Sequence, residues 1–178
     1  IRRVDPDGTI STIVGTGKFG FSGDGGPAIW ADLGNPNSVF LDGNGNIYIA
    51  DSDNRRIRRV DDAGIITTVA GSGGPSHLGE GGPATQASID GPRALFVDNV
   101  GNLFFADTDN RVRRVDPEGT ITTVAGTDER GFSGDGGPAV EARLFEPASM
   151  FKDDAGNLYI CEGGDHGSGP RVRRVDLE

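Results

Sequence analysis

Cysteine and histidine are nearly missing from this sequence. Its 178 residues include one cysteine, Cys161, and two histidines, His77 and His166. A single cysteine cannot form a disulfide within the chain, and two histidines cannot supply a three-histidine zinc site inside one copy. Two copies together would bring more histidines into reach. Cys161 lies in an apolar run typical of a strand, so we expect it to be buried as a small hydrophobic residue.

Long apolar runs and positive charge are scarce as well. No stretch of 18 apolar residues occurs, so we expect no membrane insertion. Lysine and arginine total 17 against 27 acidic residues, which gives a formal net charge of −10. A nucleic-acid-binding protein needs a basic surface to displace counterions from phosphates, so no nucleic-acid partner is expected. The acidic surface indicates solubility, or binding of cations or basic partners.

What the sequence has instead is glycine and an internal repeat. Glycine accounts for 30 residues while 34% of the chain is hydrophobic, a mixture typical of short strands joined by tight turns. The motif IRRVD or VRRVD occupies residues 1–5, 57–61, 112–116 and 172–176. These positions divide the chain into repeats of about 1–56, 57–111 and 112–171, with a repeated final strand at 172–176.

Each repeat carries the pattern of four short strands, which we letter a to d. Strand a follows a proline such as Pro36, and strand b follows Gly-Asn, as at 46–51. Strand c is the Arg-rich motif, and strand d is rich in threonine, as at 64–71. Bounding glycines and turns such as DGNGN favour antiparallel hairpins. The sequence therefore predicts an all-β fold of β-propeller blades with four antiparallel strands each, three repeats per chain.

A long loop joins strand d to the next strand a, as in FSGDGGPAIWADL at 21–33. Gly-Gly-Pro-Ala predicts a tight turn into one short helical turn, with proline at its first position. The alanines and the leucine or isoleucine after it would then pack on the neighbouring blade. We expect the first arginine of each strand c to pack its stem between blades and to pair with nearby acids. These arginines are Arg2, Arg58, Arg113 and Arg173.

Two sets of acidic residues recur at equivalent positions and are the candidate binding residues. The set in the long loop is Asp24, Glu80 and Asp135. The set that ends strand b is Asp51, Asp107 and Glu162. Rings of carboxylates could hold a cation, although no loop has the D-x-D-x-D-G pattern of a calcium site. The structural interpretation is that the first set accepts N–H bonds from its own loop. The second would accept them from the following turn or pair with Arg55 and Arg111.

No catalytic constellation accompanies these acids. Ser22 and Ser133 lie in glycine-rich loops with no histidine that recurs beside them, and the GDGG runs lack the lysine of a phosphate-binding loop. His77 takes the place of phenylalanine in the second long loop. His166 lies in GGDHGSGP at 163–170, an insertion in the third repeat. Because loops carry function on rigid scaffolds, this insertion is the best local sign of a special surface.

Residues 45–60, Gly-Asn-Ile-Tyr-Ile-Ala-Asp-Ser-Asp-Asn-Arg-Arg-Ile-Arg-Arg-Val, resemble the signature of the NHL-repeat family. The FSGDGGPA segments are similar to the long-repeat variety of bacterial extracytoplasmic proteins. The resemblance covers nearly the whole chain and implies one NHL-repeat propeller segment over residues 1–178. It also implies an extracellular or periplasmic location and six blades in a ring. Propellers of this family serve as binding platforms, as sensor ectodomains and, less often, as lyases.

The strand order along the chain is c-d, a-b-c-d, a-b-c-d and a-b-c. A blade buries its faces only against its neighbours, and propellers have about 4–8 blades, so three repeats do not close a ring alone. Two copies that exchange strands could close a six-bladed ring as a homodimer, with one of two c strands redundant at each junction. The alternative is that the chain belongs to a longer propeller.

The function predicted from the sequence is a non-enzymatic propeller scaffold for protein binding or self-assembly, without cofactor or metal. The alternative is a fragment of a propeller enzyme of the lyase or lactonase type, with a metal held by carboxylates in the central channel. A further possibility is that the repeats reflect engineering or recent duplication. The unequal third repeat and the HLGE sequence of the second loop argue against an idealised design.

Overall fold

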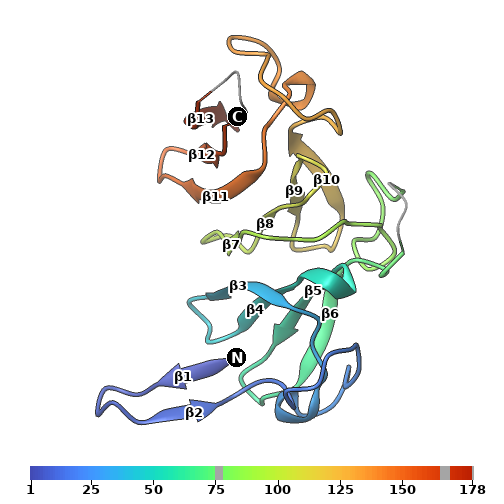
Figure 1. The fold of residues 1–178 in the computed structure, drawn as a ribbon, viewed down its shortest axis with the longest axis vertical. Coiled ribbons are helices and arrows are strands. Elements are labelled where there is room, and N and C mark those ends of the chain that lie inside the picture. Colours follow the sequence, from blue (N-terminus) through green and yellow to red (C-terminus); the bar gives the residue numbers. More distant parts are fainter. Residues whose placement is uncertain (75–77, 165–168, 178) are drawn as a thin grey trace.

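The computed structural model describes residues 1–74, 78–164 and 169–177, which form four antiparallel sheets (Figure 1). The strands of the first two sheets are Arg2–Val4 (β1), Ile10–Thr12 (β2), Pro36–Leu41 (β3), Ile47–Asp51 (β4), Arg56–Val60 (β5) and Ile66–Ala70 (β6). The strands of the other two are Leu95–Val97 (β7), Leu103–Ala106 (β8), Val112–Val115 (β9), Ile121–Ala125 (β10), Pro147–Lys152 (β11), Asn157–Glu162 (β12) and Arg171–Asp176 (β13).

The strand order of the sheets is the one expected from the repeats. The sheet β3-β4-β5-β6 and the sheet β7-β8-β9-β10 each hold strands a, b, c and d in meander order. The end sheets are β1-β2, which holds c and d, and β11-β12-β13, which holds a, b and c. The predicted all-β fold of propeller blades is therefore confirmed. The sheets follow one another along an arc (Figure 1), and the a strands β3, β7 and β11 contact each other in turn.

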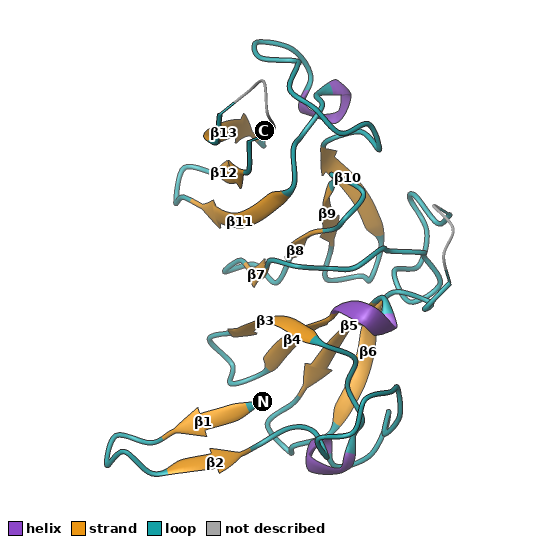
Figure 2. Ribbon diagram, viewed as in Figure 1, coloured by secondary structure: helices purple, strands orange, loops and turns teal. Residues whose placement is uncertain are grey.

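The long loops fill the spaces between successive sheets. The first contains the 3₁₀ helix Ala28–Trp30 (η1) and the third contains Ala139–Glu141 (η3), as Figure 2 shows. The N–H of Gly15 donates to the carbonyl of Ala28 at 3.0 Å, and the N–H of Ala28 donates to the carbonyl of Gly64 at 2.8 Å. The loop thus joins strand d of one sheet to strand d of the next. The predicted helical turn is present in the first and third long loops, with the proline one position earlier, as its N-cap, whereas the second loop forms a turn without a helix at this place.

Three hydrophobic clusters make the core, and each lies between two successive sheets. We call the face of a blade that carries Ala50 and Ile57 its forward face, and the face that carries Ile49 and Val60 its back face. The forward face of β3–β6 packs on the back face of β7–β10, with alanines of the long loop between them. The same arrangement joins β1–β2 to β3–β6 and β7–β10 to β11–β13. Each blade is thus stabilised mainly by its neighbours.

Cys161 is exposed, so the prediction that it is buried was wrong. It occupies the forward-face position that Ala50 and Ala106 hold in the complete blades, where both are fully buried. Within the described residues no further sheet follows β11–β13. The forward face of this sheet therefore also exposes Phe151 (65%) and Val172 (64%). The apolar run had indicated a strand correctly, but it could not show whether a neighbour covers this face.

Candidate functional site

In two of the sheets, β3–β6 and β11–β13, the structure brings one member of each acidic set together at a single arginine. In β3–β6 this residue is Arg58, which is fully buried on the back face of β5. Its Nη2 lies 2.7 Å from Asp24 Oδ1, and its Nη1 lies 3.4 Å from Asp51 Oδ2. Asp51 ends the adjacent strand β4, whereas Asp24 comes from the long loop that crosses the sheet. A buried cation between two carboxylates links the loop to the sheet.

The bonding of Asp24 differs from the prediction. Its carboxylate accepts from Nε and Nη2 of Arg58 and from Oγ1 of Thr68. The expectation that it accepts N–H bonds from its own glycine-rich loop was wrong, because the side chain points away from that loop toward the guanidinium of the sheet. Residues of this acidic set bind the loop to strands c and d.

Asp51 behaves partly as expected. It accepts from the backbone N–H of Gly34 at 2.6 Å and from Nδ2 of Asn54 in the following turn at 2.8 Å. The predicted pairing with Arg55 was wrong, since Arg55 Nε lies 2.6 Å from Asp90 Oδ1 of the next blade. The corresponding Arg111 lies 3.8 Å from Asp128. These arginines point to neighbouring loops, and beside Asp51 the arginine of strand c, Arg58, takes the place expected for Arg55.

The third repeat has the same arrangement in an end sheet. Arg173 Nη2 lies 2.6 Å from Asp135 Oδ1, and Nη1 lies 3.5 Å from Glu162 Oε1. The guanidinium of Arg171 also stacks on the ring of Phe132, 3.6 Å from its centroid, as Arg56 does on Phe21 at 3.8 Å. Such cation–π contacts hold the FSGD loop against strand c. The equivalent of these phenylalanines in the second repeat, His77, lies outside the described residues, as does His166.

The middle blade distributes its charges differently. Arg113 Nη2 lies 3.0 Å from Oε2 of Glu80, which also accepts from the backbone N–H of Thr123 at 2.6 Å. Asp107 accepts from the backbone N–H groups of Asp109 and Arg111, each at 3.2 Å. In this blade the arginine therefore pairs with the loop acid, and the strand acid is bonded by its own turn.

Burial changes the titration of the acids that end strand b. Burial, with a smaller contribution from the charge of Asp109, raises the pKa of Asp107 to about 7. Burial also raises the pKa of Asp51, but hydrogen bonds from Asn54 and Gly34 and the charge of Arg58 oppose it. The pKa of Glu162 is raised by burial as well and is opposed by Arg173 and Arg171. The raised pKa of Asp107 is due chiefly to its burial, which the charges of Arg113 and Arg111 offset only in part.

The contacts of the six repeated carboxylates indicate whether they are free to bind a ligand. Each of the six carboxylates takes part in an ion pair or hydrogen bond within its own blade. Across residues 1–74, 78–164 and 169–177, no three histidine, cysteine or acidic side chains lie together as a possible metal site. Within the same ranges no helix is long and apolar enough to span a bilayer. The arrangement therefore supports a structural link between loop and sheet.

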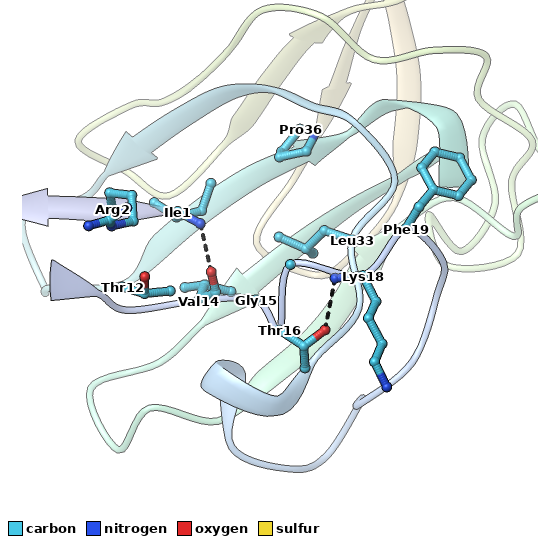
Figure 3. Close-up of a pocket in the computed structure, with 11 residues that line it drawn as sticks. Ile1, Arg2, Thr12, Val14, Gly15, Thr16, Lys18, Phe19, Leu33 and Pro36 are labelled. Atoms are coloured by element: carbon cyan, nitrogen blue, oxygen red, sulfur yellow. Dashed lines mark hydrogen bonds between the residues drawn. The ribbon is translucent and has the colours of Figure 1, made fainter.

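Sequence reasoning missed a hollow of about 470 Å³ at the free edge of β1 (Figure 3). Ile1 and Arg2 line it from β1, and Gly15 to Lys18 line it from the start of the long loop. Leu33 and Pro36 close it on the side of the next blade. The signal for it was present in the sequence, because the first repeat has strands c and d without strands a and b.

Several curated animal proteins have sequences similar to this chain. The profile of the Teneurin NHL domain matches residues 19–76 and 73–133. Teneurin-1 of Mus musculus and Teneurin-1 of Homo sapiens are each 32% identical to the chain, over 93% of it and 7% of their own length. Teneurin-4 of Homo sapiens is 29% identical over 72% of the chain. The chain thus spans less than a tenth of the length of these relatives.

Solved structures share the fold. A protein of unknown function from Bacteroides thetaiotaomicron has a TM-score of 0.70 at 21% identity, covering 95% of this chain and 40% of its own. Streptogramin B lyase has a TM-score of 0.56 at 12% identity, covering 99% and 47%. A gluconolactonase from Xanthomonas campestris has a TM-score of 0.52 at 13% identity, covering 80% and 44%. At such identities the likeness concerns the fold alone.

The expected NHL-repeat resemblance is confirmed, while the association with bacterial proteins is not, because the curated relatives named above are mammalian. The matched profile covers more than half of the chain, and the likeness to Teneurin-1 covers nearly all of it. The chain belongs to the Teneurin NHL domain family and folds as a run of NHL-type β-propeller blades.

Proposed function

We propose that this chain is a non-enzymatic, extracellular scaffold that binds other propeller blades through its open end faces, a second copy of itself included. The observation that carries this proposal is that residues exposed on the end sheets are buried at the equivalent positions of the complete blades. Val172 is 64% exposed on the forward face of β11–β13, whereas Ile57 and Val112 at the same position of the complete blades are fully buried. Exposed apolar patches of this kind mark sites of protein interaction.

The opposite end of the chain offers the complementary surface. Val4 and Ile10 on the back face of β1–β2 are 63% and 53% exposed. Inside the chain a forward face always packs on a back face, so the forward face of one copy and the back face of a second copy have matching character. Repeated head-to-tail contacts of this type close into a ring if the rotation permits. A six-bladed ring formed as a homodimer is one such closure.

The proposal that the chain is not an enzyme rests on the acids. The six carboxylates that could have ringed a channel are bonded to arginines, amides or hydroxyl groups of their own blades. The lyase and the lactonase among the structural relatives share the fold at 12–13% identity, which gives no argument for shared chemistry. We propose the extracellular location from the family resemblance. We propose a protein partner because an apolar end face suits contact with another protein.

Sedimentation of the purified chain over a range of concentrations tests the scaffold. We expect association that Val172→Asp abolishes, because a charge on the forward face would be buried against the partner. Val140→Asp is the matched control, since Val140 is 48% exposed on a long loop away from the forward face of β11–β13. A wild-type chain that stays monomeric at every concentration would refute self-assembly.

Metal analysis tests the assignment as a non-enzyme. A scaffold is expected to purify without stoichiometric metal and to melt at the same temperature with and without a chelator. A metal-dependent lyase or lactonase would instead lose stability when the metal is removed, because metal binding contributes to the stability of the folded state. One equivalent of tightly bound metal with a chelator-sensitive Tm would overturn the proposal.

A further inference from the structure

We infer that Arg113 in the middle blade is a proton-controlled switch between two acids. It pairs with Glu80 of the long loop while Asp107 holds a proton, and it turns to Asp107 when that proton leaves for solvent. The inference goes beyond the proposed function, because it concerns the interior of one complete blade and not the end faces. The sheet β7–β10, which holds Arg113 and Asp107, has a neighbouring sheet on each side.

The other sheets show that an arginine at this position of strand c can reach two acids. Arg58 has its Nη2 2.7 Å from Asp24 Oδ1 and its Nη1 3.4 Å from Asp51 Oδ2. Arg173 repeats this arrangement in β11–β13. In the middle blade the equivalent arginine forms an ion pair with the loop acid, at 3.0 Å, and with no other acid of the described residues. The same backbone position therefore allows a second placement of its guanidinium, toward the acid that ends strand b.

Arg113 is incompletely bonded in the position that it occupies. Arg58 donates to its loop acid from both Nε and Nη2, whereas Arg113 donates to Glu80 from Nη2 alone. Nε of Arg113 is buried and has no hydrogen-bond partner among the described residues. A buried donor without an acceptor costs free energy, so the contact with Glu80 holds this guanidinium less firmly than the equivalent contact holds Arg58.

Asp107 has weaker partners than its equivalent Asp51. Asp51 accepts from the backbone N–H of Gly34 at 2.6 Å and from Nδ2 of Asn54 at 2.8 Å. Within the described residues Asp107 accepts two backbone N–H bonds of its own turn, each at 3.2 Å. It is 2% exposed, so its carboxylate would be buried without a cation in contact. Such a charge is costly unless it is paired, which favours the protonated acid as long as the arginine stays with the loop.

The charges around Asp107 identify Arg113 as the cation that responds. Burial raises the pKa of Asp107 to about 7, with a smaller contribution from the charge of Asp109, and the charges of Arg113 and Arg111 oppose this. The guanidinium of Arg111 faces Asp128 of the following loop at 3.8 Å. Arg113 alone occupies the position from which an arginine reaches the strand acid in the other sheets.

The other charged residues that pack around this turn have partners elsewhere or no ion pair with Asp107. Asp90, ahead of β7, is bonded to Arg55 and Thr108, and Glu146, after the third long loop, pairs with Arg130. Arg93 lies in the adjacent strand, where its backbone N–H donates to Ala106, and in the described part of the chain it forms no ion pair with Asp107. Loss of the proton from Asp107 therefore leaves a buried negative charge that attracts Arg113.

The switch acts on the second long loop. Glu80 accepts the backbone N–H of Thr123 in β10 at 2.6 Å, so its carboxylate is fixed to the backbone and does not follow the arginine inward. The ion pair with Arg113 is thus lost when the guanidinium turns to Asp107, and the loop keeps its link to β10 alone. The alanines of this loop stay packed between the blades. Residues 79–82 are therefore held more firmly below neutral pH than above it.

The test follows the Nε–H resonance of Arg113 and the amide resonance of Thr123 by NMR, from about pH 5 to about pH 8.5. We expect both resonances to shift with one midpoint near pH 7. Above that midpoint, amide hydrogen exchange at residues 79–82 should speed up relative to residues 23–26, the equivalent segment of the first long loop. Asp107→Asn should abolish both titrations and leave the resonances at their low-pH positions, because an amide carries no charge. Asp62→Asn, on an exposed turn, is the matched control and should leave both titrations unchanged.

A second variant distinguishes an arginine that moves from an acid that titrates alone. Glu80→Gln removes the competing charge, so Arg113 should stay with Asp107 and the midpoint should fall by about one pH unit or more, an approximately tenfold loss of proton affinity. An unchanged midpoint would mean that the arginine does not turn, and it overturns the switch. So does the absence of any titration of Arg113, or a titration that persists in Asp107→Asn.

These outcomes are independent of the proposed function. A monomeric chain in which Arg113 titrates as expected refutes self-assembly and keeps the switch. A chain that associates through its end faces but shows no titration of Arg113 keeps the scaffold and overturns the switch.

Discussion

The complete blades and the end sheets of this chain carry similar residues at equivalent positions, in different surroundings. Val60 and Val115, in strand c of the complete blades, are 4% and 6% exposed, while Val4 in the same place of β1 is 63% exposed. Each of these c strands is hydrogen-bonded to a d strand, but β5 and β9 also pair with a b strand, whereas within the described residues β1 pairs with β2 alone. A strand of this repeat therefore forms with its hairpin partner, whereas its burial depends on the neighbouring blade.

The largest effect is expected where a buried charge loses its partner. Arg58→Ala should lower the free energy of unfolding by about 3–5 kcal/mol, because it leaves Asp51 buried without its cation. Arg2→Ala, at the same repeat position but exposed and unpaired within the described residues, should change it by less than about 0.5 kcal/mol. Urea unfolding followed by circular dichroism measures both. Equal losses would mean that the end sheet is as tightly packed as the complete blade.

The same comparison can be made with an apolar side chain in strand d. Ile121 is fully buried and Ile10 is 53% exposed at the equivalent position. Ile121→Ala should cost about 2–5 kcal/mol, from lost burial and the cavity it leaves. Ile10→Ala should cost less than about 0.5 kcal/mol. Urea unfolding compares them, and a large loss for Ile10→Ala in a monomeric chain would contradict the exposed back face.

The two complete blades can be distinguished from each other by pH. The pKa of Asp107 is about 7 in the folded chain, against about 3.9 for an aspartate in an unfolded chain. The folded state therefore binds more protons between these values, and this residue lowers the free energy of unfolding as the pH rises from about 4 to about 7. Asp107→Asn should remove that decline.

The expected gain of Asp107→Asn over the wild type is on the order of 1–3 kcal/mol at pH 8 and should be near zero at pH 4. Chemical denaturation at the two pH values measures it. Asp62→Asn, on an exposed turn, serves as the control. A gain that is the same at both pH values would show that Asp107 is not the group responsible.

The smallest effect on stability is expected at the forward face. Cys161 is exposed and should react with a thiol reagent in the native chain, with a change in unfolding free energy below about 0.5 kcal/mol. Ala106→Cys places a thiol at the equivalent position of a covered face and should be protected from the reagent until the chain unfolds. A spectroscopic thiol assay follows both rates. Protection of Cys161 that appears only as the chain associates would locate the contact on this face.

Much of the fold was predictable because its signals are local. Pro36, the Gly-Asn pairs and the Arg-rich motif mark strand after strand, and the observed sheets keep that order. At the candidate site, the sequence predicted that arginines pair with acids, but not which arginine pairs with which acid. The arginines of strand c do bind acids, but Arg58 takes the place expected for Arg55. The partner Asp24 is 34 residues away in the chain. Which guanidinium reaches it depends on where the long loop crosses the sheet.

The repeat, its four strands and the order of strands along the chain follow from the sequence, because alternation and turn residues act within a few positions. The packing of the blades sets which faces are covered, since Ala106 and Cys161 occupy equivalent positions with opposite exposure. It also decided which acid keeps an arginine. Arg113 pairs with Glu80 of the long loop, whereas Asp107 is hydrogen-bonded within its own turn and has a raised pKa. Burial and charge here are properties of neighbouring blades, and no single repeat contains them.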